Sequence, residues 1–228
     1  MANIRNEAET KELYRKILTA ATALFMQKGF EKTTLMDIAK LSGVSKRVII
    51  YEMNSKEELL GHLVTKFLDG VTEASIAVAK EFTDDNLLIF MANEVLQIYM
   101  AEMNEDMRNL YLAGYSMPKT SEEVLRRRSN ILYERFGDMF PNFELKDFYE
   151  FEIASMGIMR AYMSVPCDMY FTLEAKTERL IVTMLRIYDV DKDIIGKVNE
   201  FIKKIDFKTV AQKAVESVFS ELEIKTNK

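Results

Sequence analysis

Residues 33–59 read TTLMDIAKLSGVSKRVIIYEMNSKEEL and decide the fold of the N-terminal part of the chain. Thr34 stands three residues before Asp37, a pairing typical of a helix start, and Gly43 is the kind of residue that ends a helix. Ser45 then caps a second helix of about residues 46–53. The stretch therefore predicts two short helices joined by a glycine turn, which are the dimensions of a helix-turn-helix.

The flanking residues extend this unit in both directions. An apolar stripe predicts a helix over about residues 9–28, which Gly29 ends. On the other side, the sequence from Ser55 to Glu58 forms a Ser-x-x-Glu capping box that begins a long helix into Lys80. Because no linker rich in Gly, Ser or Pro occurs near residue 60, this long helix couples the N-terminal unit to the remainder mechanically.

The rest of the chain is also helical in its pattern. Further helices are predicted near residues 85–104, 105–116, 120–139, 144–165, 170–188, 191–204 and 208–223. The three prolines, at 118, 141 and 166, stand where this pattern breaks. The prediction is an all-α fold, with a three-helix helix-turn-helix domain over residues 1–55 and a helical bundle over residues 56–228.

Composition excludes several classes of protein. One cysteine and one histidine leave no internal disulfide and no credible metal cluster, and no metal or other cofactor is expected. No Gly-rich phosphate loop or nucleophile motif is present, so we do not expect an enzyme. Residues 1–16 are polar, and the longest apolar run, Leu87–Ala92, is far shorter than a membrane span. These observations predict no leader, no membrane association and a cytoplasmic location.

Charge and side-chain chemistry point the N-terminal unit toward DNA. The net charge is −5, yet residues 1–60 hold ten Lys and Arg against eight Asp and Glu. In the first turn of the second short helix, Lys46 and Arg47 follow Ser45, at the point where such a helix enters a major groove. The free N–H groups at the helix starts beside Thr34 and Lys56 are suited to phosphate.

Five short motifs in this region share their order and spacing with a known family. They are Gly29-Phe30, Thr33-Thr34, Asp37-Ile38-Ala39, Gly43-Val44-Ser45-Lys46 and Ser55-Lys56-Glu57-Glu58-Leu59. Together they resemble the N-terminal signature of the tetracycline-repressor (TetR) family. The resemblance implies a homodimer that binds a palindromic double-stranded DNA operator and represses a promoter until a small ligand binds the helical body. The operator-contacting positions that it implies are Thr34, Ser45, Lys46, Arg47, Tyr51 and Lys56.

The sequence also departs from the family pattern. Ile50 stands where the family usually has a phosphate-touching tyrosine, and Glu52 brings a negative charge close to the DNA backbone. Arg47 replaces a residue that is commonly small, and Met36 one that is commonly basic. Ile50 and Glu52 motivate an alternative reading, in which the chain is a helical interaction protein whose DNA binding has weakened or lapsed. Tyr51 has an alternative of its own, as a core residue.

Methionine and aromatic residues gather in the body. Residues 85–170 hold ten of the fifteen methionines, and flexible thioethers beside flat rings suit a deformable apolar cavity. We expect a pocket for an apolar or amphipathic effector, while ordinary core packing remains the alternative for each single residue. The candidate lining residues are Phe90, Met103, Tyr111, Tyr115, Phe136, Met139, Met156 and Met159.

Polar residues of the body and its last helices complete the prediction. Asn93 and Gln97 fall opposite an apolar stripe, so they are expected to face solvent. At most one residue of Arg126–Arg128 can face inward, and a solvated face is the favoured reading of this run. Residues 144–188 look like the two helices that pair across the dyad in the resembled family. Residues 191–223 are predicted as an added C-terminal pair of helices.

Overall fold

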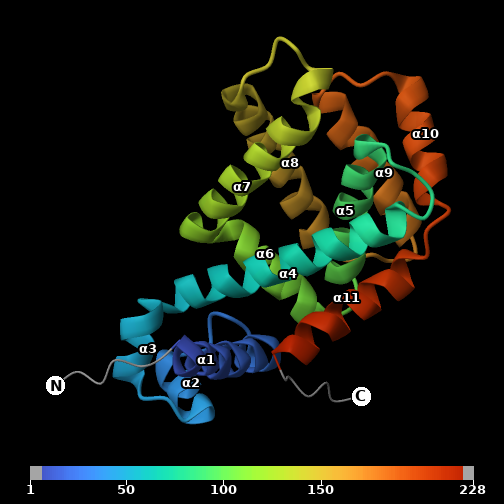
Figure 1. Cartoon of the computed structure of the whole chain (residues 1–228). Coiled ribbons are helices and arrows are strands. Elements are labelled where there is room, and N and C mark those ends of the chain that lie inside the picture. Colours follow the sequence, from blue (N-terminus) through green and yellow to red (C-terminus); the bar gives the residue numbers. More distant parts are fainter. Residues whose placement is uncertain (1–6, 223–228) are drawn as a thin grey trace.

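The computed structural model describes residues 7–222, apart from the side chain of Met139. Within these residues the chain forms eleven α-helices, one short 3-10 helix and no strand. The all-α prediction is confirmed. The helices divide visually into a small group at one end of the molecule and a larger bundle above it (Figure 1).

The small group consists of α1 (Glu7–Lys28), α2 (Leu35–Ser42) and α3 (Lys46–Met53), and we call it the head. Its core is built from the inward faces of the three helices and contains Phe25, Ile38 and Ile49, all buried. Gly29 and Gly43 end α1 and α2 with φ angles of 81° and 69°. In this left-handed region a side chain with a Cβ is strained, which explains why glycine ends both helices.

The long helix α4 (Lys56–Ala79) runs out of the head and along the underside of the bundle (Figure 1). Near its start it buries Leu59, Leu60 and Leu63, and further along it buries Phe67 and Val71. One uninterrupted helix therefore belongs to the cores of both parts, as the lack of a linker near residue 60 predicts. Ser55 caps its start by accepting from the Glu58 N–H, while the Glu58 carboxylate accepts from the Asn54 side chain.

The bundle contains the remaining helices. They are α5 (Asn86–Ala101), α6 (Glu105–Ser116), α7 (Pro118–Phe136), the 3-10 helix η1 (Gly137–Met139), α8 (Leu145–Ser164), α9 (Leu173–Ile187), α10 (Lys192–Ile202) and α11 (Phe207–Glu221). Among the boundaries that differ from expectation, two have a clear local cause. α5 ends at Ala101 because Asn104 accepts from the Met107 N–H and caps the next helix. α7 begins at Pro118, since proline is well suited to a first helical position.

The last helix, α11, returns from the bundle toward the head (Figure 1). It packs along α4, where the rings of Phe67 and Phe219 meet edge to face at 5.9 Å between centroids. Lys66 of α4 and Glu221 form an ion pair of 2.7 Å. At the end of α11, the hydroxyl of Thr19 in α1 donates to the carbonyl of Leu222. The C-terminal helix thus contacts head and bundle at once.

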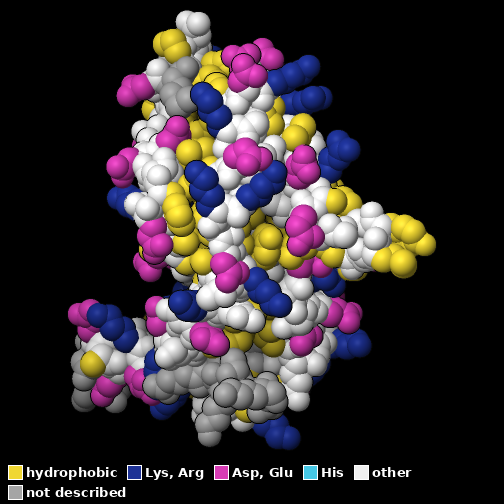
Figure 2. Space-filling view, turned by 90° about the vertical axis from the view of Figure 1, so that its right-hand side faces the viewer, with side chains coloured by type: hydrophobic (Ala, Val, Ile, Leu, Met, Phe, Trp, Pro, Cys, Tyr) yellow, Lys and Arg dark blue, Asp and Glu magenta, His cyan; other side chains and the backbone are white. Residues whose placement is uncertain are grey.

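The surface and the helices carry a few further features. On the face that Figure 2 shows, charges of both signs alternate over the bundle without a large patch of one sign. Within residues 7–222, no helix combines the length and the apolar character needed to cross a bilayer.

Candidate functional site

The start of α2 is fixed by a compact set of hydrogen bonds around Asp37. Its carboxylate accepts from the Thr34 N–H at 2.9 Å, from the Thr34 hydroxyl at 2.7 Å and from the Lys28 ammonium at 2.7 Å. In return, the Thr34 oxygen accepts from the Asp37 N–H at 3.2 Å. The bond from Lys28, with those from Thr34, lowers the pKa of Asp37 well below its usual range. Thr34 is therefore an exposed helix cap whose hydroxyl already donates a hydrogen bond to the Asp37 carboxylate.

The second short helix, α3, buries one face and exposes the other. Ser45 caps it by accepting from the Val48 N–H at 3.3 Å, while Ile49 and Met53 lie in the core of the head. Lys46 and Arg47, in the first turn, are exposed. An anchored helix with an exposed basic first turn has the geometry of a recognition helix.

The residues that depart from the resembled family lie on the same helix. Tyr51 is 82% exposed, which excludes the alternative that it belongs to the core. It follows Arg47 by four residues, so both side chains lie on one face of α3. Ile50 is 43% exposed, and Glu52 is half-buried. The exposed face of α3 thus presents a guanidinium, a phenol and an apolar side chain.

Lys56 has a position that the sequence did not indicate. Its ammonium donates to the carbonyl of Phe30 at 2.8 Å and lies 4.1 Å from the centroid of the Phe30 ring. The side chain is half-buried and ties the start of α4 to the loop after α1. Because an ammonium has three donors, this bond leaves donors for a second acceptor. Lys56 therefore has a structural role in addition to the predicted phosphate contact.

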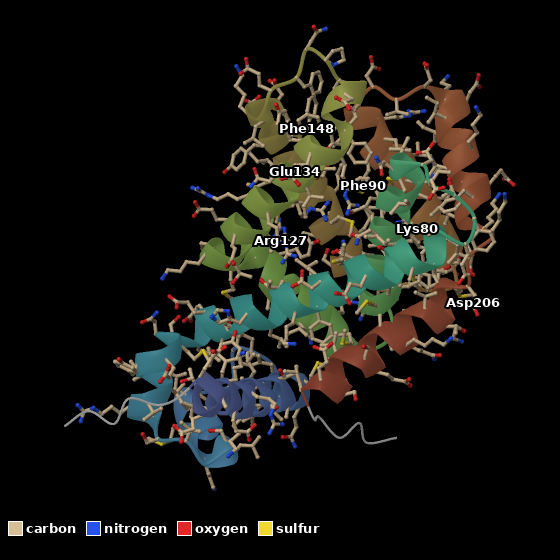
Figure 3. All side chains as sticks on the ribbon, in the orientation of Figure 1. Lys80, Phe90, Arg127, Glu134, Phe148 and Asp206 are labelled. Carbon is tan, nitrogen blue, oxygen red and sulfur yellow. The ribbon has the colours of Figure 1, made fainter. Side chains whose placement is uncertain are left out.

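The body contains a cavity of about 200 Å³, which we call the aromatic cavity. It lies among α5, α7, α8 and the segment from α9 to α10. Its lining consists of Leu87, Phe90, Leu132, Phe136, Phe140, Phe148, Leu185, Tyr188, Asp189, Val190, Asp191 and Ile194. Figure 3 labels two of these lining residues, Phe90 from α5 and Phe148 from α8. The rings of Phe90 and Phe136 meet edge to face at 5.7 Å between centroids.

The predicted ligand-binding residues are dispersed. Phe90 and Phe136 line the aromatic cavity, whereas Tyr115 and Met156 line a separate, more polar depression. Tyr111 and Met159 lie in the core, and Met103 is 37% exposed beyond the end of α5. The side chain of Met139 lies outside the described residues. Sequence reasoning did not single out Phe140, Phe148 and Tyr188, although the density of aromatic residues after residue 136 was a signal for the first two.

A smaller cavity of about 50 Å³, the polar cavity, adjoins the aromatic one. The two share Phe90 and Leu132 as wall residues. The polar cavity is also lined by Leu68, Thr72 and Ser75 of α4. Because α4 continues into the head, the wall of this cavity is built in part from the helix that positions α3.

An ion cluster lies at the wall of the polar cavity. Arg128 of α7 donates to Glu94 of α5 at 2.8 Å and to Glu152 of α8 at 2.5 Å. Both carboxylates are fully buried and the arginine is 9% exposed. Tyr188 donates to Glu152 at 3.4 Å. Among Arg126–Arg128, Arg128 is buried, so the favoured reading of a solvated face is wrong for this residue, while Arg126 is exposed and Arg127 is half-buried.

The expectation that Asn93 and Gln97 face solvent is wrong. Gln97 is fully buried and accepts from the Tyr115 hydroxyl at 2.6 Å, while its amide donates to Asn93 at 3.1 Å. Asn93 in turn donates to Thr72 and Ser75, each at 3.3 Å. The helix is buried on nearly all sides, so its polar face meets α4 and α6 instead of water. The chain of hydrogen bonds links α6, α5 and α4.

Comparison with known proteins identifies the head. Residues 17–63 match the family described as bacterial regulatory proteins, tetR family. The chain is 33% identical over 96 residues to the HTH-type transcriptional regulator TtgR of Pseudomonas putida, which is 42% of this chain and 45% of that protein. It is 35% identical over 77 residues to the probable regulator YttP of Bacillus subtilis, which is 32% of this chain and 37% of that protein. The matched stretches thus span less than half of these relatives.

Solved structures extend the likeness of the fold to the bundle. RolR in complex with the ligand resorcinol superposes with a TM-score of 0.59 at 13% identity, covering 88% of this chain and 97% of that one. A TetR-family regulator from Pectobacterium atrosepticum superposes with a TM-score of 0.55 at 14% identity, covering 81% and 94%. The head therefore matches the tetR family of bacterial regulatory proteins over residues 17–63, and the bundle shares its fold with solved regulators.

Proposed function

We propose that the protein is a cytoplasmic, homodimeric repressor that leaves its palindromic operator when a small apolar or amphipathic molecule binds the body. Residues 1–55 are the DNA-binding domain, and residues 56–228 form the ligand-binding and dimerisation domain. The helices within residues 144–188 pair across the dyad. Residues 191–223 are added helices that tie the bundle to the head.

One observation carries the DNA-binding part of the proposal. α3 is anchored through Ile49 and Met53, while Lys46 and Arg47 in its first turn are exposed. Arg47 and Lys46 are assigned to base edges, which guanidinium and ammonium groups reach in a major groove. Thr34, Ser45 and Lys56, beside the N-terminal ends of α2, α3 and α4, are assigned to the phosphate backbone, as is Tyr51 in the last turn of α3.

The two adjoining cavities support the ligand-binding part. The aromatic cavity offers an apolar interior, and the polar cavity reaches the wall formed by α4. A molecule that extends into the polar cavity and enlarges it displaces α4, which forms part of its wall, and with it the head. RolR, whose fold is similar, binds the small molecule resorcinol. Phe90 and Phe136 are the residues of the sequence-based set that we retain for ligand contact.

The test is a genome-wide selection of DNA fragments by the purified full chain, with an Arg47→Ala variant and a Lys80→Ala variant in parallel. Lys80 lies at the far end of α4, so its substitution removes the same charge away from the head (Figure 3). We expect the wild type and Lys80→Ala to recover one inverted-repeat motif and Arg47→Ala to lose it. Recovery of random fragments by all three would contradict the proposal.

A second candidate function is favoured by one observation, the exposed apolar Ile50 on the DNA-facing side of α3. In that alternative the head binds a protein and has lost its affinity for DNA. Retention on non-specific DNA at low salt separates the two, because phosphate contacts dominate binding there. A chain that flows through such a column without delay supports the alternative.

A further inference from the structure

We propose that the body binds an amphipathic organic cation, with its apolar part in the aromatic cavity and its ammonium group on Glu94. The inference deepens the proposed function, because it names the chemical class of the effector and the residue that selects it.

The ion cluster has one positive group for two negative ones. Arg128 donates to Glu152 through Nε at 2.5 Å and through Nη2 at 3.4 Å, but to Glu94 only through Nη1 at 2.8 Å. The other oxygen of Glu94, Oε2, is buried and accepts no hydrogen bond from any described residue. A buried carboxylate oxygen without a partner is costly, and an N–H donor would satisfy it.

The neighbouring groups do not supply that donor. Tyr115 donates to Gln97 and Tyr188 donates to Glu152. Two further arginines of α7, Arg127 and Arg135, line the polar cavity with Glu94. Arg127 is paired with Asp69 of α4, and neither of the two donates to Glu94 Oε2. The site that Glu94 offers therefore remains available to a donor that enters the cavity.

The aromatic cavity suits the rest of such a molecule. Its charged lining residues are Asp189 and Asp191, and no Lys, Arg or His from the described chain lines it. The faces of aromatic rings attract cations, and this cavity has five ring-bearing residues in its wall. Its volume of about 200 Å³ lies below the common range of about 300–1,000 Å³ for ligand pockets, so the molecule has about one ring.

Protonation competes with the cation for Glu94. Burial raises the pKa of Glu94, the charge of Glu152 adds to this effect, and Arg128 opposes it. A proton on Glu94 therefore stabilises the empty site, and an ammonium group must displace it. Since displacement is easier when protons are scarce, the affinity for a cation should rise with pH, whereas the affinity for a neutral analogue should not.

The experiment measures binding to the full chain by calorimetry, without DNA. The probes are 4-tert-butylbenzylamine, which is a cation at neutral pH, its neutral analogue 4-tert-butylbenzyl alcohol and the anion 4-tert-butylbenzoate. We expect the wild type to prefer the amine to the alcohol by about tenfold or more, as a hydrogen bond to a charged group allows. Glu94→Gln should bring the two affinities together. The exposed Glu134 of α7 provides the matched control as Glu134→Gln, which should keep the preference (Figure 3).

Two results would overturn the proposal. One is equal or tighter binding of the alcohol or the carboxylate by the wild type. The other is a preference for the amine that survives in Glu94→Gln. If that variant does not fold, the wild type alone decides, because equal or tighter binding of the alcohol or the carboxylate already overturns the proposal. Because the assay contains no DNA, a failure to bind DNA contradicts the proposed function and leaves this result unchanged.

Discussion

Arg47 and Lys56 carry the same charge but have different surroundings. Arg47 is exposed on α3, whereas Lys56 is held by the carbonyl and the ring of Phe30. We expect Arg47→Ala to reduce the difference in binding free energy between specific and non-specific DNA by about 1–3 kcal/mol, which is the contribution of a base contact. Lys56→Ala should lower the salt slope by about one unit and destabilise the head by about 1 kcal/mol.

The measurements are affinities for the selected site and for random DNA over a range of salt, with thermal unfolding of each variant. Lys80→Ala is the control for the loss of one charge and should change neither quantity. If Arg47→Ala and Lys56→Ala lose specificity and salt slope to the same degree, the assigned roles are wrong.

Asp37 makes the stability of the head depend on pH in the acidic range. Hydrogen bonds from Lys28 and Thr34 depress its pKa in the folded state. Its contribution to stability is present above the unfolded pKa, near 4, and is lost as the pH falls toward the lower folded value. Asp37→Asn should therefore lower the melting temperature at pH 7, and the gap from the wild type should narrow at pH 3. Asp84→Asn, in the exposed loop after α4, is the control, and a gap that widens at pH 3 would contradict the argument.

The residues that sequence reasoning misplaced share a physical cause. Gln97 and Asn93 are polar, and an amphipathic pattern assigns such residues to solvent. In the structure α5 is covered on nearly all sides, so its polar face is satisfied by Tyr115, Thr72 and Ser75. Partners of this kind come from other helices, and their positions depend on packing that no local pattern encodes.

At the scale of elements, helix starts were the most predictable feature. The caps at Thr34, Ser45 and Ser55 all accept the hydrogen bonds that their spacing predicts. Such caps involve neighbours in the sequence only, so they can be read from it. The path of α11 was not predictable, although its apolar stripe was. Its stripe requires a partner, and only the structure shows that the partner is α4.

The packing of α11 on α4 requires a glycine. A Cβ on Gly70 would lie 2.9 Å from Cγ2 of Val218, a buried and β-branched residue that has little freedom to move. We expect Gly70→Ala to destabilise the protein by about 1–3 kcal/mol through overpacking, despite the better helix propensity of alanine. Gly196→Ala, within α10, meets no atom within 4 Å and should stabilise by about 0.5–1 kcal/mol. Thermal or urea unfolding measures both, and equal effects of the two substitutions would refute the close approach.

At the scale of the whole molecule, the two-part architecture followed from the sequence because one strong motif and one long helix determine it. The positions of the cavities did not. Phe90 and Phe136 line a cavity, whereas Tyr111 and Met159 fill the core. Methionine and aromatic residues can either line a cavity or fill a core, so composition alone does not show which of the two a given residue does.

The proposed dimer has a surface to test on α8. Ile153 is 55% exposed there, and Ala154, Gly157 and Ala161 are exposed on the same helix. Small apolar residues allow two helices to approach closely, so we expect a dimer in solution and a monomer at micromolar concentration for Ile153→Arg. Light scattering on the full chains provides the masses. Phe82→Arg places the same charge on another half-exposed apolar residue, in the loop after α4, and should remain dimeric. A monomeric wild type would contradict the proposed dimer.

The coupling between ligand and operator should depend on the part of α4 between the cavities and the head. Leu68, Thr72 and Ser75 of α4 line the polar cavity, and α3 packs at the start of the same helix. Changing the separation of two heads breaks their simultaneous docking on half-sites about 34 Å apart, or at multiples of this spacing. Replacing Thr65 and Lys66 by glycine weakens the helix between these two points and also removes the ion pair with Glu221 of α11. The buried neighbours Val64 and Phe67 stay intact, so each binding event should persist while the coupling of about 1–3 kcal/mol falls.

The matched control replaces Ala77 and Val78 by glycine. These residues lie in the same helix but on the far side of the cavity from the head, so the loss of helix propensity is alike while the path to α3 is untouched. Operator affinity is measured with and without saturating ligand for the wild type and both variants. The ligand should reduce the operator affinity of the wild type and of the control by the same factor, and that of the Thr65–Lys66 variant by a smaller one. A full ligand response in that variant would falsify transmission through α4. It would point instead to other links between bundle and head, such as α6, which packs on α1, and α11, whose end accepts a hydrogen bond from Thr19 of α1.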